Sequence, residues 1–138
     1  MSLFNIFDVS GSGMSAQSVR LNTTASNIAN ADAVSSSVDG TYRARYPVFE
    51  AELAKASYQQ QEAVGVQVKG IVESDSPLQK EFAPQHPMAD KDGFIYKPNV
   101  NVMEQMADMI SASRSYQMNV QVAEAAKSML QQTLNMGK

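Results

Sequence analysis

Residues 7–28, FDVSGSGMSAQSVRLNTTASNI, place large apolar side chains at intervals of seven: Phe7, Met14, Leu21 and Ile28. Seven residues make nearly two turns of an α-helix, so these four side chains share one face. Mostly small residues precede them by three positions and flank the same face: Phe4, Gly11, Ser18 and Ala25. Small residues let a second helix approach closely. The pattern therefore favours helix-on-helix packing, with an ordinary amphipathic helix on a private core as the alternative.

This first helix is expected to be weak on its own. Gly11 and Gly13 are poor helix formers, and the polar residues between Asn22 and Asn27 are indifferent ones. Because most helical stability in proteins comes from packing an apolar face, we expect the segment to become ordered mainly when neighbours surround it. Asn30 is the predicted stop, since asparagine tolerates the left-handed conformation in which many helices end.

A second helix is predicted at the C-terminal end. Asn101 is placed to cap it, and Glu104 follows three residues later, as in a capping box. Further residues follow helical spacing in two neighbouring rows, first Met106, Met109, Ser113, Tyr116, Val120, Ala123, Leu130 and Leu134, then Val122, Ala126, Met129 and Met136. A helix packed on one core usually needs a single stripe, so the two rows indicate contact with several neighbours.

Arg114 and Tyr116 are expected to face different neighbours, because residues two positions apart point in nearly opposite directions on a helix. We expect Tyr116 to pack inside, beside Met109 and Val120, with a polar partner for its hydroxyl. Arg114 has no acidic residue one turn away. We expect it to reach a carboxylate or carbonyl of an adjacent subunit, with a solvated surface arginine as the alternative.

The middle of the chain is predicted to be a small, loop-rich β segment. A strand with alternating apolar residues begins at Tyr42, and Pro47 limits it to a sheet edge. Another strand begins near Val64 and is broken or bulged at Gly70. Residues 50–62, between these strands, fit either helix or strand.

A second small hairpin is predicted from residues 78–82 and 94–96, with Asp92-Gly93 as its turn signal. The expected fold class is mainly α, with terminal helices that form an assembly-dependent coiled coil or bundle around a β-rich insertion. The expected parts are an N-terminal helix in 1–31, the middle in 32–99, and a C-terminal helix in 100–138.

Composition excludes several classes of function. The formal net charge is −3 and lysine and arginine do not cluster, so a nucleic-acid surface is not expected. The chain has no cysteine, which excludes disulfides and thiolate metal sites. The opening residues resemble neither a secretory signal peptide nor a transmembrane span, because Asp8 interrupts them and Arg20 is the first basic residue.

No group of residues predicts catalysis or cofactor binding. His86 is the only histidine and lies among prolines, which suits a loop better than a metal site. Residues 90–93, DKDG, resemble a calcium loop only weakly, since the closing acidic residue is missing. A small hydrolase or binding module would need His86, Asp90 and Asp92 to act together. We therefore expect no catalytic residue, no cofactor and no metal.

Two motifs carry a resemblance to a known family. Residues 25–31, ASNIANA, at the end of the first helix resemble the signature of bacterial flagellar axial proteins, with Asn27, Ile28, Ala29 and Asn30 as its centre. Residues 98–102, PNVNV, followed by 109–117, MISASRSYQ, are similar to the proximal-rod members of the flagellar basal-body rod protein family. The resemblance spans nearly the whole chain and is strongest at its two ends.

The resemblance implies a structural subunit of the proximal rod, which transmits motor torque and helps to line the export channel. It implies partners among copies of the chain, other rod proteins, the basal-body ring and the export apparatus. It also implies a location in the basal body of the bacterial flagellum, in the rod that spans the periplasm, and export without a cleaved signal peptide. The alternative is a coiled-coil adaptor or chaperone-like protein of a secretion system. The residues expected at subunit interfaces are Phe7, Met14, Leu21, Ile28, Met106, Met109, Arg114, Tyr116, Val120, Leu130 and Leu134.

Overall fold

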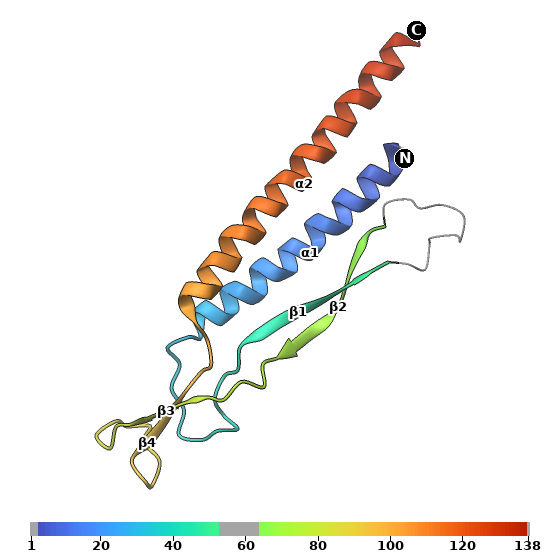
Figure 1. Cartoon of the computed structure of the whole chain (residues 1–138). Coiled ribbons are helices and arrows are strands. Elements are labelled where there is room, and N and C mark those ends of the chain that lie inside the picture. The colour runs from blue at the N-terminus through green and yellow to red at the C-terminus, as the bar shows by residue number, and fades with distance from the viewer. Residues whose placement is uncertain (1–2, 53–63, 138) are drawn as a thin grey trace.

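The computed structural model describes residues 3–52 and 64–137, which form an elongated molecule (Figure 1). A pair of helices lies at one end, a two-stranded sheet runs along one of them, and a smaller sheet lies beyond the helix pair. The terminal helices and the small antiparallel middle confirm that part of the predicted fold class. The elements in chain order are α1 (Leu3–Ala29), β1 (Arg45–Ala51), β2 (Val66–Glu73), β3 (Gln79–Phe82), β4 (Phe94–Lys97) and α2 (Val102–Met136).

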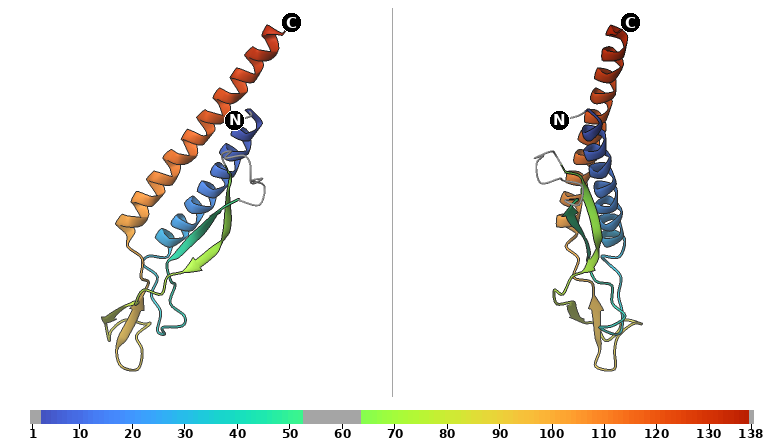
Figure 2. Two further views of the ribbon diagram at one scale, coloured as in Figure 1. Left: turned by 45° about the vertical axis from the view of Figure 1, so that its right-hand side comes forward. Right: turned by 90° about the vertical axis from the view of Figure 1, so that its right-hand side faces the viewer.

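The two helices run antiparallel and side by side (Figure 2). Asn27, near the end of α1, bonds to Gln105, near the start of α2, and Gly13 of α1 lies against Asn119 of α2. The same number of residues separates the two positions on each helix, which sets one register along the whole pair. Since α2 is the longer helix, its C-terminal end extends past the N-terminus of α1 (Figure 1).

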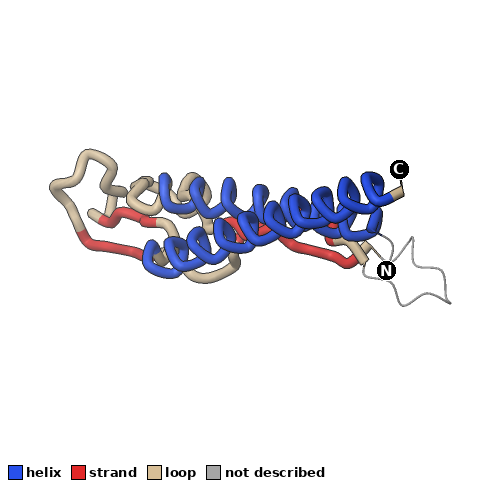
Figure 3. The backbone as a smooth tube through the Cα atoms, turned by 90° about the horizontal axis from the view of Figure 1, so that it is seen from above, coloured by secondary structure: helices blue, strands red, loops and turns tan. Residues whose placement is uncertain are grey.

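The first sheet consists of β1 and β2 in antiparallel pairing, and it runs alongside the helices (Figure 3). The register shifts between Val48 and Phe49, because Val48 is paired with Gly70 and Phe49 with Val68. Lys69 is therefore the extra residue of a bulge, one position before the glycine where the sequence predicted a break or bulge. Most of the ambiguous segment 50–62 lies outside the described residues, and Glu50 and Ala51 belong to β1.

The second sheet confirms the predicted hairpin, with β3 and β4 in antiparallel pairing. Gly93 adopts a φ of 80°, which only glycine reaches without strain, directly before β4 begins. The rings of Phe82 and Phe94 meet edge to face, with centroids 5.1 Å apart, and Lys80 lies over Phe94 at 3.9 Å. These contacts stabilise a sheet that has almost no buried core.

Asparagine side chains form hydrogen bonds with backbone groups at one end of each helix. Asn101 has an extended backbone, and its Oδ1 accepts from the Met103 amide at 3.2 Å, which confirms the predicted cap. α1 ends at Ala29, which confirms Asn30 as the predicted stop. The left-handed backbone given as the reason is wrong, since no described residue other than glycine has a positive φ. Instead, Asn30 donates from Nδ2 to the Ser26 carbonyl at 2.8 Å and satisfies an acceptor at the helix end.

The buried apolar core is small. Its members among the described residues are Ala16, Ala44, Ile95, Val100, Ala112 and Ala126. Four of these are alanines, which contribute little buried area, so most large apolar side chains keep contact with solvent. Within residues 3–52 and 64–137, neither helix combines the length and hydropathy needed to cross a membrane.

Candidate assembly surface and its polar junction

A buried asparagine joins the helix pair to the first sheet. Asn27 is 1% exposed and donates from Nδ2 to the Gln105 side chain and to the Arg45 carbonyl, both at 2.8 Å. Its Oδ1 accepts from the Tyr42 hydroxyl at 2.8 Å and from the Arg45 amide at 2.9 Å. Both donors and both acceptor positions are thus occupied, so the buried amide is fully satisfied.

The Asn27 side chain forms hydrogen bonds with β1 like those that a neighbouring strand would form. Its side-chain amide bonds both the N–H and the C=O of Arg45, the two groups that a second strand would otherwise pair. The edge of β1 is therefore closed by α1 at this point. We call the set Asn27, Tyr42, Arg45 and Gln105 the polar junction.

A second asparagine, Asn99, fixes the segment that leads into α2. Its Oδ1 accepts from the Ala44 amide at 2.8 Å, and its Nδ2 donates to the Ser76 carbonyl at 2.8 Å. Ala44 and the adjoining Pro98 and Val100 are buried. The start of β1, the segment after β2 and the start of α2 are thereby held at one point.

The first turns of α2 also pack near β1, as the environment of Tyr46 shows. Burial, followed by the negative charges of Glu104 and Asp108, raises the pKa of the Tyr46 phenol, and a contact from Gln105 opposes the rise. Both carboxylates belong to α2. The polar junction therefore continues from the end of α1 across β1 to the first two turns of α2.

The surface between the two helices is made of small and polar residues. Gln105, Ala112, Asn119 and Ala126 recur at intervals of seven on α2, and all are buried or half-buried. The buried positions of α1 are Ser10, Ala16, Thr23, Thr24 and Asn27. We call this surface the helix seam. Because it holds small residues, the helices approach closely and leave their large apolar residues elsewhere.

Gly13 is expected to be the most size-sensitive position of the helix seam. A Cβ at Gly13 would lie 2.8 Å from Nδ2 and 3.3 Å from Cγ of Asn119, whereas a Cβ at Gly11 meets nothing within 4 Å. Gly13→Leu should lower the free energy of unfolding by about 1–3 kcal/mol through overpacking. Gly11→Leu should raise it by up to about 0.8 kcal/mol through helix propensity. Urea denaturation followed by circular dichroism measures both, and equal effects would contradict the assigned seam.

Around its buried row, α2 exposes many large apolar residues. We call this the outer face, and its exposed apolar members are Met103 (77%), Met106 (50%), Ile110 (55%), Met118 (58%), Val122 (47%), Met129 (55%) and Met136 (88%). Seven large apolar side chains that are each at least 47% exposed are unusual on one helix of an isolated soluble protein. Exposed patches of this kind mark interaction surfaces.

The predicted interface residues differ in exposure. On α1, Phe7, Met14, Leu21 and Ile28 are all half-buried. On α2 the half-buried ones are Met109, Val120 and Leu130, and the exposed ones are Met106, Arg114, Tyr116 and Leu134. Tyr116 remains 38% exposed and Leu134 68% exposed, so their packing would have to come from other chains.

The remaining motifs do not form a chemical site. His86 is exposed in the turn after β3, where its Nδ1 accepts from the Met88 amide at 3.1 Å. Asp90 is bonded at 2.7 Å to the amide of Lys91. Among the residues that the structure describes, no three histidine or carboxylate side chains are grouped as metal ligands.

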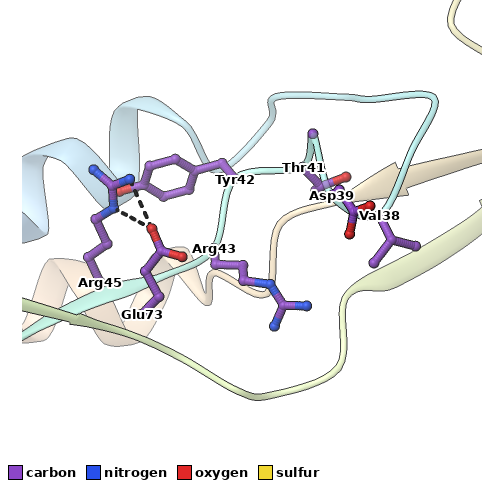
Figure 4. A pocket seen from close by; sticks show the side chains of 8 residues that line it. Val38, Asp39, Thr41, Tyr42, Arg43, Arg45 and Glu73 are labelled. Atoms are coloured by element: carbon purple, nitrogen blue, oxygen red, sulfur yellow. Dashed lines mark hydrogen bonds and ion pairs between the residues drawn. The ribbon is translucent and has the colours of Figure 1, made fainter.

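One cavity of about 430 Å³ lies beside the polar junction (Figure 4). The Arg45 guanidinium and the Glu73 carboxylate point toward each other next to the Tyr42 ring, with nitrogen and oxygen 3.0 Å apart. Arg43 donates to the Ser74 carbonyl at 3.3 Å. The charges around the cavity are thus largely matched within the chain, and the lining residues are Val38, Asp39, Gly40, Thr41, Tyr42, Arg43, Arg45 and Glu73.

Sequence reasoning missed Gln105, Tyr42, Asn99 and Asn119. Asn99 lies within the PNVNV segment that carries the resemblance, which is the only signal that could have singled it out. Tyr42 was assigned only to a strand, and a glutamine or asparagine inside an amphipathic helix does not signal burial. These side chains gain their roles only when distant segments meet.

Fold and surface together define a class of protein. A long antiparallel helix pair with a polar seam and a large uncovered apolar surface is typical of an assembly subunit.

Comparison with known proteins specifies the class. The family described as "Flagella basal body rod protein" matches residues 7–35, and "Flagellar basal body rod FlgEFG protein C-terminal" matches residues 91–136. The flagellar basal-body rod protein FlgC of Salmonella typhimurium is 44% identical over 138 residues, that of Yersinia enterocolitica is 46% identical, and both alignments cover all of each chain. FlgC of Aquifex aeolicus is 37% identical over 139 residues, covering 100% of this chain and 99% of its own.

The chain belongs to the FlgC family of flagellar basal-body rod proteins. It is accordingly a structural protein of the rod. The family resemblance predicted from the sequence is confirmed.

Proposed function

We propose that the chain packs its helix pair with other copies and with other rod proteins into a tubular shaft that transmits motor torque and surrounds the export channel. The observation that carries this proposal is the outer face of α2, which leaves seven large apolar side chains at least 47% exposed. Packing each of them against a neighbour stabilises an assembly by about 1.5–3 kcal/mol. Helices that carry load through tight lateral packing suit a shaft.

The polar junction supports the mechanical part of the proposal. Asn27 and Asn99 tie the helix pair to the strands by hydrogen bonds that fix directions as well as distances. Force applied to the helices would therefore reach the middle segment without a flexible hinge. Arg114, exposed on α2, would meet a carboxylate or carbonyl of an adjacent subunit in the same assembly.

Delivery through the flagellar export apparatus to a rod that spans the periplasm, without a cleaved signal peptide, is part of the same proposal. Its support is the small core of buried alanines, because a chain with little buried apolar area is easily held unfolded for passage through a narrow channel. The basal-body ring would be a further partner at the base of the rod.

Cysteine labelling tests the proposal in assembled basal bodies, since the chain has no cysteine of its own. Met118→Cys places a thiol on the outer face, where the free chain should react quickly with a maleimide. In isolated basal bodies the thiol should react at least about tenfold more slowly, because packing excludes the reagent. Gln85→Cys, in the exposed turn after β3, should stay reactive in both samples. Equal labelling of Met118→Cys in both samples would count against an interface there.

A further inference from the structure

The stretch of β2 from residue 69 to residue 73 has an open outer edge in the described part of the chain, whereas the Val66 amide on the same edge is bonded to Ser12 of α1. β2 pairs with β1 only, and no described strand lies along its other edge. The Ser74 amide donates to the Ala44 carbonyl at 2.8 Å, so Ser74 directs its backbone groups toward the neighbouring strand. Along an antiparallel strand, every second residue does the same, and the residues between them direct their backbone groups to the other edge. With Arg45 opposite Glu73, the N–H and C=O of Ile71 and Glu73 point away from β1.

The opposite edge of the sheet confirms this alternation. The outward N–H and C=O of Arg45, the partner of Glu73, are those bonded by Asn27 of α1. α1 thus closes the β1 edge at Arg45. At the far end of the sheet α1 reaches β2 instead, where Ser12 Oγ accepts from the Val66 amide at 3.1 Å. The outward groups of Ile71 and Glu73 on β2 have no such partner among the described residues. An open edge of this kind is a template for another strand.

Residues 69–73, KGIVE, match themselves when two copies run antiparallel about Ile71. Lys69 of each copy then stands opposite Glu73 of the other, and the two Ile71 side chains meet at the centre. The pairing uses the outward backbone groups of Ile71 at its centre and those of Glu73 at each end, where they face Lys69, the extra residue of the bulge in the other copy. Ile71 is 55% exposed, and the Lys69 and Glu73 side chains are 66% and 53% exposed.

We propose that β2 pairs with β2 of a second copy of the chain, giving a four-stranded antiparallel sheet in the order β1-β2-β2-β1. The charges support this occupant. Within one chain Arg45 pairs with Glu73 and Lys69 with Glu50, both at 3.0 Å. Across the four strands, one row of side chains would contain Arg45 and Glu73 of one copy, followed by Lys69 and Glu50 of the other. The side-chain charge would change sign from each strand to the next. Opposite charges on neighbouring strands stabilise a sheet.

The contact is two-fold symmetric, so it closes at two copies and belongs to the free chain. It does not depend on the proposed role in the rod, where subunits repeat in one direction.

Charge reversal tests the pairing by sedimentation equilibrium of the purified chain. Lys69→Glu places two carboxylates opposite each other at both ends of the contact, and Glu73→Lys does the same with two ammonium groups. Each single variant should weaken dimerisation by roughly tenfold. The double variant restores opposite charges between copies while both ion pairs within the chain stay broken. Recovery to within about threefold of the original dissociation constant therefore reports contact between copies and not stability of the monomer.

Two controls keep the result unambiguous. Glu81→Lys, which breaks the Lys97 ion pair on the second sheet, should leave the dimer unchanged. If the outer face of α2 causes wider association, the same proteins are compared with Ile110→Asp added to all of them. A chain that stays monomeric, a dimer that ignores the single reversals, or a double variant no better than the singles would each overturn the proposal, the second by pointing to another surface.

Discussion

Asn27→Ala is expected to lower the free energy of unfolding by about 3–5 kcal/mol, as urea denaturation followed by circular dichroism would measure it. The substitution removes four hydrogen bonds, from two donors and two acceptors at the polar junction. Gln105 is 1% exposed, so water cannot replace its lost partner without opening the structure. Leaving buried polar groups unpaired costs more than an ordinary surface hydrogen bond is worth.

Two further variants give the expected scale. Tyr42→Phe removes only one of the four bonds and should cost about 1 kcal/mol. Asn22→Ala changes an exposed asparagine on the same helix and should stay within about 0.5 kcal/mol of the original chain. If Asn27→Ala were as mild as Asn22→Ala, the polar junction would not hold the molecule together.

Ile110→Asp and Met118→Asp are expected to abolish swimming in soft agar and to prevent rod assembly, while the free chain stays folded. Both side chains are more than half exposed in the isolated chain, so a carboxylate there meets water and costs little. In a packed interface the same carboxylate would be desolvated without a partner, which costs several kcal/mol at every contact. Loss of assembly without loss of monomer stability is the signature of an interface.

His86→Ala is the control for these swimming assays. Its side chain is exposed, and its Nδ1 accepts a hydrogen bond from the Met88 amide of its own turn. Motility should be unchanged. Normal swimming by Ile110→Asp and Met118→Asp, with normal protein levels, would remove the outer face from the assembly.

Several elements were predictable because their signals are local. The Asn101 cap and the β3–β4 hairpin depend on residues close in sequence, and both are present. The bulge at Lys69 was displaced by one residue from Gly70, because the register of β1 determines which residue is extra. At the end of α1, the Asn30 side chain donates to the Ser26 carbonyl. The sequence reasoning considered only the backbone conformation of Asn30 and not this side-chain hydrogen bond.

Which residues of α2 pack on α1 and which stay exposed could not be predicted. Spacing identified apolar residues on more than one side, but it could not say that alanines and polar residues pack on α1 while methionines stay outside. That choice depends on the approach distance of the helices, which Gly13 and Asn119 set together from opposite ends of the sequence. The polar junction has the same origin, since Asn27 and Gln105 meet only in three dimensions.

Electron microscopy of isolated basal bodies, with this chain traced in place, tests the central claim most directly. The outer face of α2, from Met103 to Met136, should be buried against neighbouring subunits, with the α1–α2 seam and the Asn27 hydrogen bonds unchanged. A rod in which that face remains in solvent, with the subunits joined through the strands alone, would contradict the account.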